Sequence, residues 1–169
     1  MDKKKTIGFV GLGLIGGSMA VDLRARGYAS GIIGTDKNPL NADAACRLGL
    51  VDRVVSLEEC VDDSDIVVVS VPVSAAAGII QTVLDRFRDK GYEDKIVMDV
   101  CSTKSQIAER LKYHPCRKRY VASHPMAGTE HSGPWAAMPG LLTDVLASSP
   151  TRMSRTARPC GRWRNFTGR

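Results

Sequence analysis

The sequence contains no apolar run that approaches the roughly 18 to 20 residues needed to span a membrane. At its amino-terminal end, the residues MDKKK lead into a glycine-containing apolar stretch, without the apolar core and cleavage site of a signal peptide. These two absences predict a cytoplasmic protein with no membrane partner. The composition, 43% hydrophobic and 25% charged residues over 169 positions, is typical of one folded domain.

Paired cysteines and metal-ligand spacings are also absent. The five cysteines are odd in number and form no CxxC pair, which argues against a disulfide framework and against a zinc knuckle. Only three histidines are present, and a metal site built from Cys101, His124 and His131 would have no ligand spacing on a single element. We therefore expect reduced thiols and no bound metal.

Acidic residues are scarce in one part of the chain only. Residues 1–140 hold 18 basic and 17 acidic side chains, whereas residues 141–169 hold six arginines and one aspartate, so most of the net charge of +6 belongs to the last segment. Because this segment shows no helical or strand period, we predict a basic, disordered tail over 141–169. The abrupt change in composition is also what a shifted reading frame produces, and we interpret the tail in that way.

The first residues carry a glycine motif between a strand and a helix. The stretch TIGFVGLGLIGG over 6–17 places Gly11, Gly13 and Gly16 after a short apolar run, and a helical apolar period follows over 14–26. In this GxGxxG arrangement Gly11 allows a tight turn, Gly13 lets a pyrophosphate approach the backbone, and Gly16 lets the helix pack closely against the strand. The helix N-terminus then presents free N–H groups to the anion.

A second strand, expected over 31–35, ends in Asp36, twenty residues beyond Gly16. An acidic residue at this distance accepts hydrogen bonds from a ribose diol, and its charge would repel a 2′-phosphate. The pattern therefore predicts NAD as the cofactor in preference to NADP, although Lys37 argues in the other direction. The alternative is a structural glycine turn followed by an unrelated surface aspartate.

The rest of the first 140 residues alternates between strand and helix patterns. Further strands are expected over 53–55, 65–71, 95–100 and 120–122, and helices over 39–48 with Asn38 as cap, over 75–90 with Ser74 as cap, and from Ser102 or Thr103 to 112. The run DIVVVSV over 65–71 lacks polar alternation, as expected of a central strand covered by helices on both faces. We predict an α/β fold with a doubly wound parallel sheet, forming a dinucleotide-binding domain over 1–140.

Ligands bind at the carboxyl ends of the strands in such sheets. The predicted cofactor-binding residues lie in the glycine turn and after the second and fourth strands: Gly11, Leu12, Gly13, Leu14, Ile15, Gly16, Asp36, Val71 and Pro72. Ser102, after the fifth strand, is either a helix N-cap or a hydroxyl beside the nicotinamide. His124, after the sixth, is either structural or a base that takes a proton from a substrate hydroxyl. His114 is expected to face solvent.

Five motifs occur in order: GLGLIGGS, IIGTD, VSVPV, DVCSTK and HPMAGTEHSG. With them the chain resembles prephenate dehydrogenases, a family that includes arogenate dehydrogenases, over residues 5 to about 140. The resemblance implies that His124 accepts the proton of the ring hydroxyl, that Ser102 supports substrate and nicotinamide, and that Glu130 lines the same pocket. It also implies the reaction, the NAD-dependent oxidative decarboxylation of prephenate to 4-hydroxyphenylpyruvate in tyrosine biosynthesis.

After residue 140 the chain departs from the family pattern, which would continue into a helical dimerisation domain. We therefore expect a truncated, weakly active or inactive copy, and we expect the homodimer of the full-length family not to form. Three alternatives remain open: an arogenate dehydrogenase, a dinucleotide-binding module without chemistry, and a nucleic-acid-binding protein that uses the arginines of the tail. Because the basic charge is confined to the tail, we predict no nucleic-acid partner.

Overall fold

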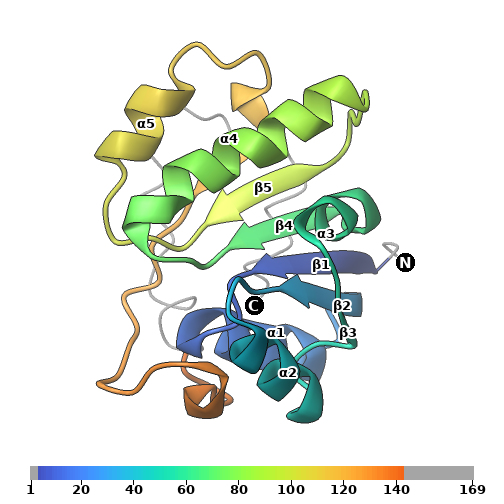
Figure 1. The fold of residues 1–169 in the computed structure, drawn as a ribbon, viewed down its shortest axis with the longest axis vertical. Coiled ribbons are helices and arrows are strands. Elements are labelled where there is room, and N and C mark those ends of the chain that lie inside the picture. Colours follow the sequence, from blue (N-terminus) through green and yellow to red (C-terminus); the bar gives the residue numbers. More distant parts are fainter. Residues whose placement is uncertain (1–3, 143–169) are drawn as a thin grey trace.

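A computed structural model describes residues 4–142 and shows a single six-stranded sheet (Figure 1). All five strand pairings are parallel, and the order is β3-β2-β1-β4-β5-β6. The strands are β1 Lys5–Val10, β2 Ala29–Thr35, β3 Arg53–Val54, β4 Ile66–Val69, β5 Ile96–Asp99 and β6 Tyr120–Ala122. The predicted doubly wound parallel sheet is confirmed. From β1 the chain adds β2 and β3 on one side and then β4, β5 and β6 on the other, so the strand order switches between β1 and β4. Such a switch point is where these sheets open a crevice for a ligand.

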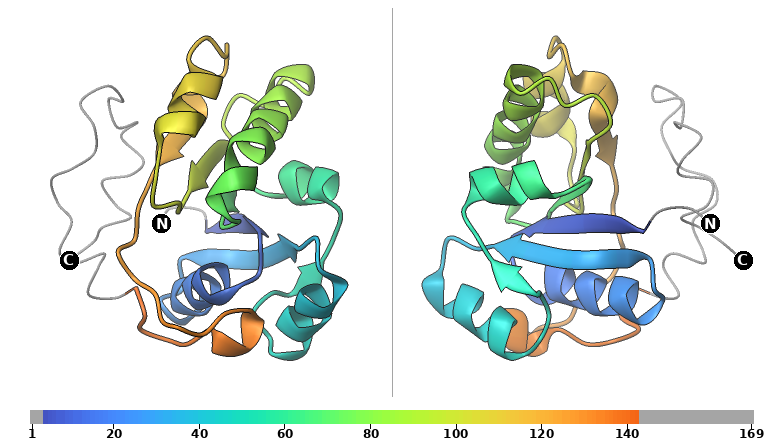
Figure 2. Two further views of the ribbon diagram at one scale, coloured as in Figure 1. Left: turned by 60° about the vertical axis from the view of Figure 1, so that its left-hand side comes forward. Right: turned by 90° about the vertical axis from the view of Figure 1, so that its right-hand side faces the viewer.

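Helices cover both faces of the sheet (Figure 2). One face carries α1 Leu14–Ala25 and α2 Pro39–Arg47, and the other carries α3 Leu57–Asp63, α4 Val73–Asp89 and α5 Ser105–Leu111. Two short 3-10 turns, η1 Arg117–Arg119 and η2 Pro134–Ala136, complete the described part. None of the helices within residues 4–142 has both the length and the apolar character that a membrane crossing requires.

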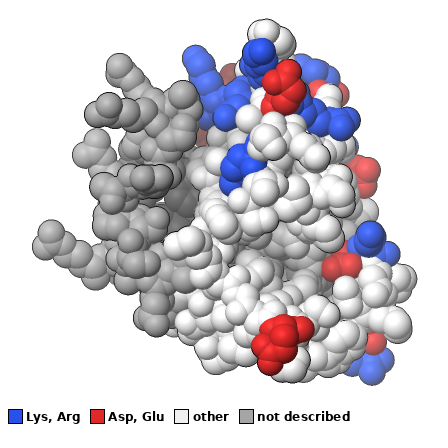
Figure 3. Space-filling view, turned by 90° about the vertical axis from the view of Figure 1, so that its left-hand side faces the viewer, with Lys and Arg blue, Asp and Glu red and all other residues white. Residues whose placement is uncertain are grey.

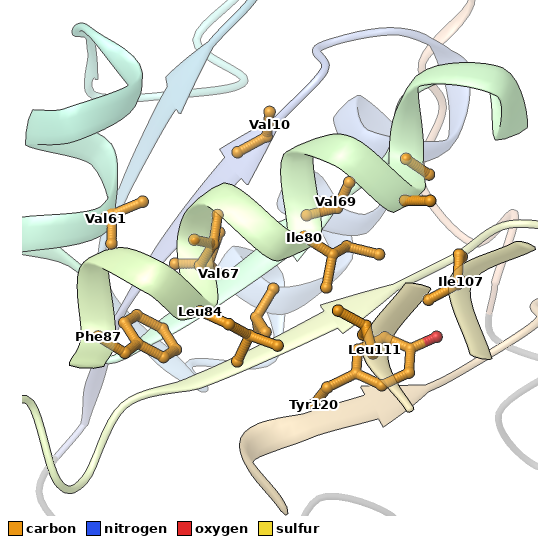
Figure 4. Packing of buried hydrophobic residues seen from close by; sticks show 14 of the residues in the cluster. Val10, Val61, Val67, Val69, Ile80, Leu84, Phe87, Ile107, Leu111 and Tyr120 are labelled. Carbon is orange, nitrogen blue, oxygen red and sulfur yellow. The ribbon is translucent and has the colours of Figure 1, made fainter. Parts of the chain in front are cut away.

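The core is divided by the sheet into two clusters, which explains the uninterrupted apolar sequence of β4. Val67 and Val69 pack with α4 and α5, whereas Ile66 and Val68 pack with α1. The α4 side is filled by Ile80, Leu84 and Phe87 from the helix, against strand residues that include Val67 and Tyr120 (Figure 4). A strand that is buried on both faces has no position for an exposed polar residue, so the predicted lack of polar alternation in this strand is confirmed.

Some helix boundaries agree with the sequence patterns, and others do not. The Asn38 side chain caps α2 by accepting a hydrogen bond from the Leu40 N–H, as predicted. The prediction that Ser74 caps the next helix is wrong: α4 begins at Val73, and the Pro72 carbonyl accepts from the Ala75 and Ala76 N–H groups. The fixed φ of Pro72 leads directly into the helix, which leaves Ser74 within the first turn.

The sequence patterns missed one helix. α3 is a short helix whose start is closed by a capping box, in which the Ser56 side chain accepts from the Glu59 N–H and the Glu59 carboxylate accepts from the Ser56 N–H. The S-x-x-E spacing of residues 56–59 is the sequence signal that could have predicted it. The predicted tail over 141–169 lies outside the described residues, apart from Leu141 and Leu142; Leu142 is buried in the α1-side core.

Candidate active site

The glycine turn between β1 and α1 has little room for side chains. Gly11 has a φ of +95°, and a Cβ built on it would lie 2.5 Å from the Ser70 carbonyl oxygen. A Cβ on Gly16 would lie 2.4 Å from the Gly11 carbonyl oxygen and 2.4 Å from Ser70 Oγ. The first glycine therefore permits the turn, and the third permits the close approach of α1 to the ends of β1 and β4.

Gly13 differs from Gly11 and Gly16 because a Cβ built on it would have no atom within 4 Å. It is the N-cap of α1, makes no side-chain cap, and accepts the Gly17 N–H through its carbonyl oxygen. The N–H groups of Leu14, Ile15 and Gly16 precede the first intrahelical donor and have no intrahelical acceptor. An open helix N-terminus of this kind is suited to bind the pyrophosphate of a dinucleotide.

Asp36 lies directly beside the glycine turn. Its Oδ2 atom accepts a hydrogen bond of 2.8 Å from the Leu12 N–H, and its Oδ1 atom accepts one of 2.8 Å from the Asn38 N–H. These two bonds hold the carboxylate at the end of β2 and leave lone pairs on both oxygens for further donors. The arrangement has the geometry needed to receive a ribose diol next to the pyrophosphate position.

The end of β4 borders the same turn. Ser70 Oγ donates to the Gly11 carbonyl oxygen at 2.6 Å, and the Val71 carbonyl oxygen accepts a hydrogen bond from Cys101 Sγ at 3.8 Å. Val71 and Pro72 therefore stand between the glycine turn and the loop that follows β5. Burial raises the pKa of the Cys101 thiol to about 11, so this thiol is protonated at neutral pH.

Ser102 and His124 follow neighbouring strands. Asp99, the last residue of β5, pairs with Ala122, the last residue of β6, so the two loops leave the sheet at the same level. Both Ser102 and His124 are exposed. The prediction that Ser102 or Thr103 begins the helix is wrong, because α5 begins at Ser105. The side chain of Lys104, the residue before that helix, turns inward to the strand ends instead.

Glu130 and His131 lie farther along the loop that starts at His124. The Glu130 side chain is 84% exposed and has His131 Nε2 at 3.4 Å from its Oε1 atom. Within residues 4–142 no group of three potential metal-binding side chains is found.

The segment after β6 returns across the sheet to α1 (Figure 1). The Met138 N–H donates to Ser18 Oγ at 3.0 Å, and the Gly140 N–H donates to Asp22 Oδ1 at 2.7 Å. A Cβ on Gly17 would lie 2.7 Å from Ala137 Cβ, so the second of the paired glycines in α1 makes room for this segment. The loop that carries His124 and Glu130 is therefore anchored at both ends.

The face toward which the strands point is shown in Figure 3. Most of the described surface on this face carries no charged side chain, and Lys and Arg gather along its upper edge. A separate hollow of about 310 Å³ lies on α2, lined by residues that include Leu40, Arg47 and Trp135. Because no residue of the glycine turn lines that hollow, the turn and not the hollow defines the candidate site.

The profile described as "Prephenate dehydrogenase, nucleotide-binding domain" matches residues 19–152, which is more than half of the chain. The chain belongs to the prephenate dehydrogenase family. The resemblance noted from the five motifs is thereby confirmed.

Individual relatives agree with this assignment. The prephenate dehydrogenase of Bacillus subtilis (strain 168) is 35% identical over 137 residues, which cover 79% of this chain and 36% of that protein. The structure of prephenate dehydrogenase from A. aeolicus in complex with hydroxyphenyl propionate and NAD+ aligns with a TM-score of 0.71 at 31% identity, over 84% of this chain and 48% of that chain. For Synechocystis arogenate dehydrogenase the TM-score is 0.68 at 30% identity, over 80% and 46%. The chain thus spans between about a third and a half of the length of these relatives.

Two features of this prephenate dehydrogenase family chain were not expected from its sequence. His114, predicted to face solvent, has a side chain that is 6% exposed and lies 3.2 Å from Asp85 Oδ1, so that prediction is wrong. The second feature is a group of hydrogen-bonded side chains beneath the ends of β5 and β6, formed by Asp99, Lys104 and Tyr120. Asp99 and Lys104 are the first and last residues of the DVCSTK motif. An acidic residue at the end of an apolar strand was the sequence signal that could have predicted a buried, hydrogen-bonded carboxylate here.

Proposed function

We propose that this chain binds NAD at the glycine turn and takes part in the oxidative decarboxylation of prephenate to 4-hydroxyphenylpyruvate. The observation that carries the proposal is the shared exit level of β5 and β6, which brings Ser102 and His124 to the same edge of the sheet as the glycine turn. Family membership supports the reaction, and the neighbouring structure from A. aeolicus was solved with NAD+.

The residues present fit the cofactor. The open side of Gly13 and the free N–H groups of Leu14 to Gly16 would hold the pyrophosphate, and the half-buried carboxylate of Asp36 would accept the ribose hydroxyls. Val71 and Pro72 would border the nucleotide on the β4 side. When bound, NAD accepts the hydride from the ring carbon that bears the hydroxyl group.

His124 is proposed as the general base. A neutral imidazole at this position accepts the proton of the ring hydroxyl, so the carbon–oxygen bond becomes a carbonyl as the hydride leaves. Loss of carbon dioxide then returns the bond electrons to the ring, which becomes aromatic, and the carbonyl oxygen regains a proton as a phenol. Ser102 is proposed to orient the substrate hydroxyl and the nicotinamide. Glu130 is proposed to contact the substrate.

Arogenate is the alternative substrate, favoured by the similarity to the Synechocystis arogenate dehydrogenase. Prephenate and arogenate differ in the side chain attached to the ring, where a keto group is replaced by an amino group. None of the proposed roles of Ser102 and His124 depends on that group, so both substrates suit the same chemistry.

The test measures NAD binding by calorimetry and, separately, NADH fluorescence after adding prephenate or arogenate to the protein with NAD. Prephenate-dependent NADH formation, with a higher kcat/KM than for arogenate, supports the proposal. A higher kcat/KM for arogenate than for prephenate would make arogenate the substrate in place of prephenate. NAD binding without NADH formation from either compound would favour a dinucleotide-binding module without chemistry.

A further inference from the structure

A buried carboxylate lies beneath the site, and the proposed reaction does not use it. Asp99, at the end of β5, has no exposed surface. Its Oδ1 atom accepts a hydrogen bond of 2.6 Å from the Tyr120 hydroxyl, and its Oδ2 atom accepts one of 2.9 Å from the Cys101 N–H and another from the Lys104 ammonium. A buried carboxylate is tolerated only with such partners. Burial, together with the bond to Asp99, raises the pKa of Tyr120, so its hydroxyl remains a donor.

Lys104 supplies the link between this carboxylate and the loops above it. An ammonium group has three N–H donors. In Lys104 they contact the Asp99 carboxylate, the Cys101 carbonyl oxygen at 2.8 Å and the Ser123 carbonyl oxygen. The three acceptors come from the end of β5, from the loop after β5 and from the first residue after β6. One side chain therefore joins two strand ends that are separate in the sequence.

The Ser123 contact is the one that matters for chemistry. The Ser123 carbonyl and the His124 N–H belong to the same planar peptide unit, so a bond to the carbonyl fixes the plane from which the His124 side chain projects. Ser102 lies between Cys101 and Lys104, and the same ammonium closes that loop through the Cys101 carbonyl. The exposed positions of Ser102 and His124 thus share one half-buried attachment, the Lys104 side chain.

We propose that Lys104 is a positioning residue that holds the peptide unit of His124, and with it the imidazole, at a fixed place relative to Ser102. The inference rests on the proposed function of His124. A general base must lie within hydrogen-bond reach of its proton, and a displacement of about 1 Å lowers turnover by about a hundredfold. Tyr120 donates the single hydrogen of its hydroxyl group to the same carboxylate and so cannot donate to the Ser123 carbonyl, which limits its role to folding stability.

Two single variants separate these roles. Lys104→Met removes the bonds to Asp99, Cys101 and Ser123 while keeping a long unbranched side chain. Tyr120→Phe is the matched control, because it removes one bond to Asp99 and leaves the Ser123 contact in place. The readout is the ¹⁵N relaxation order parameter of the His124 amide, measured on the full 169-residue chain with thermal unfolding recorded in parallel.

We expect the order parameter of the His124 amide to be about 0.85 in the unaltered protein and in Tyr120→Phe, and to fall below about 0.6 in Lys104→Met. Both variants should have lower unfolding midpoints. Where turnover is measurable, Lys104→Met should lower kcat by about a hundredfold with little change in the KM for NAD. Tyr120→Phe should retain its kcat.

An unchanged order parameter in a folded Lys104→Met protein would overturn the inference, because the lysine would then contribute to stability alone. If Lys104→Met does not fold, the double variant Asp99→Asn/Lys104→Met, which removes both charges, is measured by the same criterion. Failure of both to fold would assign Lys104 to folding and would also overturn the inference. Absence of prephenate-dependent NADH formation in the unaltered protein counts against the proposed function only, since the order parameter is measured without substrate.

Discussion

Two glycines of the same turn allow nucleotide binding to be separated from folding stability. A Cβ on Gly13 would meet no atom within 4 Å, whereas a Cβ on Gly16 would lie 2.4 Å from the Gly11 carbonyl oxygen and from Ser70 Oγ. Gly13→Ala therefore adds a methyl group only where the pyrophosphate is proposed to approach. Gly16→Ala adds one where the helix already packs against backbone.

The expected magnitudes follow from these distances. Gly16→Ala should lower the free energy of unfolding by about 1–3 kcal/mol, the range for overpacking, or about 4–12 °C in the unfolding midpoint at about 4 °C per kcal/mol. Gly13→Ala should cost less than about 1 kcal/mol, since alanine is only a poorer N-cap than glycine. Loss of one hydrogen bond to the charged pyrophosphate, about 1.5–3 kcal/mol, corresponds to NAD binding weakened by about 10- to 150-fold.

The assay pairs thermal unfolding without ligand with calorimetric titration of NAD for the unaltered protein and both variants. The expected pattern is a large loss of stability for Gly16→Ala and a large loss of affinity, with little loss of stability, for Gly13→Ala. Unaltered NAD affinity in Gly13→Ala would refute the placement of the pyrophosphate. A fully stable Gly16→Ala would refute the packing argument.

Three further predictions concern single side chains. Asp36 should set the preference for NAD, so Asp36→Ser should narrow the difference in affinity between NAD and NADP; tighter binding of NADP by the unaltered protein would contradict this role. In a protein with measurable turnover, His124→Asn should lower kcat by about a hundredfold to ten-thousandfold with little effect on NAD affinity. Ser102→Ala should lower kcat by a smaller factor. A loss confined to cofactor binding in His124→Asn would make His124 structural. A hydrogen bond from Arg86 holds the pKa of Asp62 below its ordinary value in the folded protein. The stability that this ionised pair provides is therefore complete at neutral pH and is lost as the pH falls through the folded-state pKa of Asp62. Urea unfolding should therefore show Asp62→Asn destabilised at neutral pH but not in strong acid, and equal destabilisation at both would exclude the ionic contribution.

Local patterns predicted the fold because most of its helices and strands are specified by the types of a few neighbouring residues. The glycine turn, the Asn38 cap and the strand over 120–122 depend on backbone geometry and on residue types within one turn or strand. The α/β alternation then leaves few topologies, and the parallel doubly wound sheet is the one observed. The roles of Gly11 and Gly16 in packing follow from the same short stretch.

What the sequence did not predict depends on partners that are distant in the chain. The inward turn of Lys104 is set by acceptors on β5 and after β6, and it moves the helix start to Ser105, which no local cap signal could indicate. His114 lies in a basic segment that predicted an exposed side chain, but its imidazole contacts Asp85 on α4 and is largely buried there. The anchoring of the loop after β6 on Ser18 and Asp22 is likewise a long-range contact.

The most direct test of the central claim, that the β1–α1 turn is a dinucleotide site, is a titration of the ¹⁵N-labelled protein with NAD followed through its backbone amide shifts. We predict saturable shifts at Gly13 to Gly16 and at Leu12, whose N–H bonds to Asp36. The basic segment over 110–119 should not respond. Shifts confined to that segment, or no saturable change at the turn, would contradict the account.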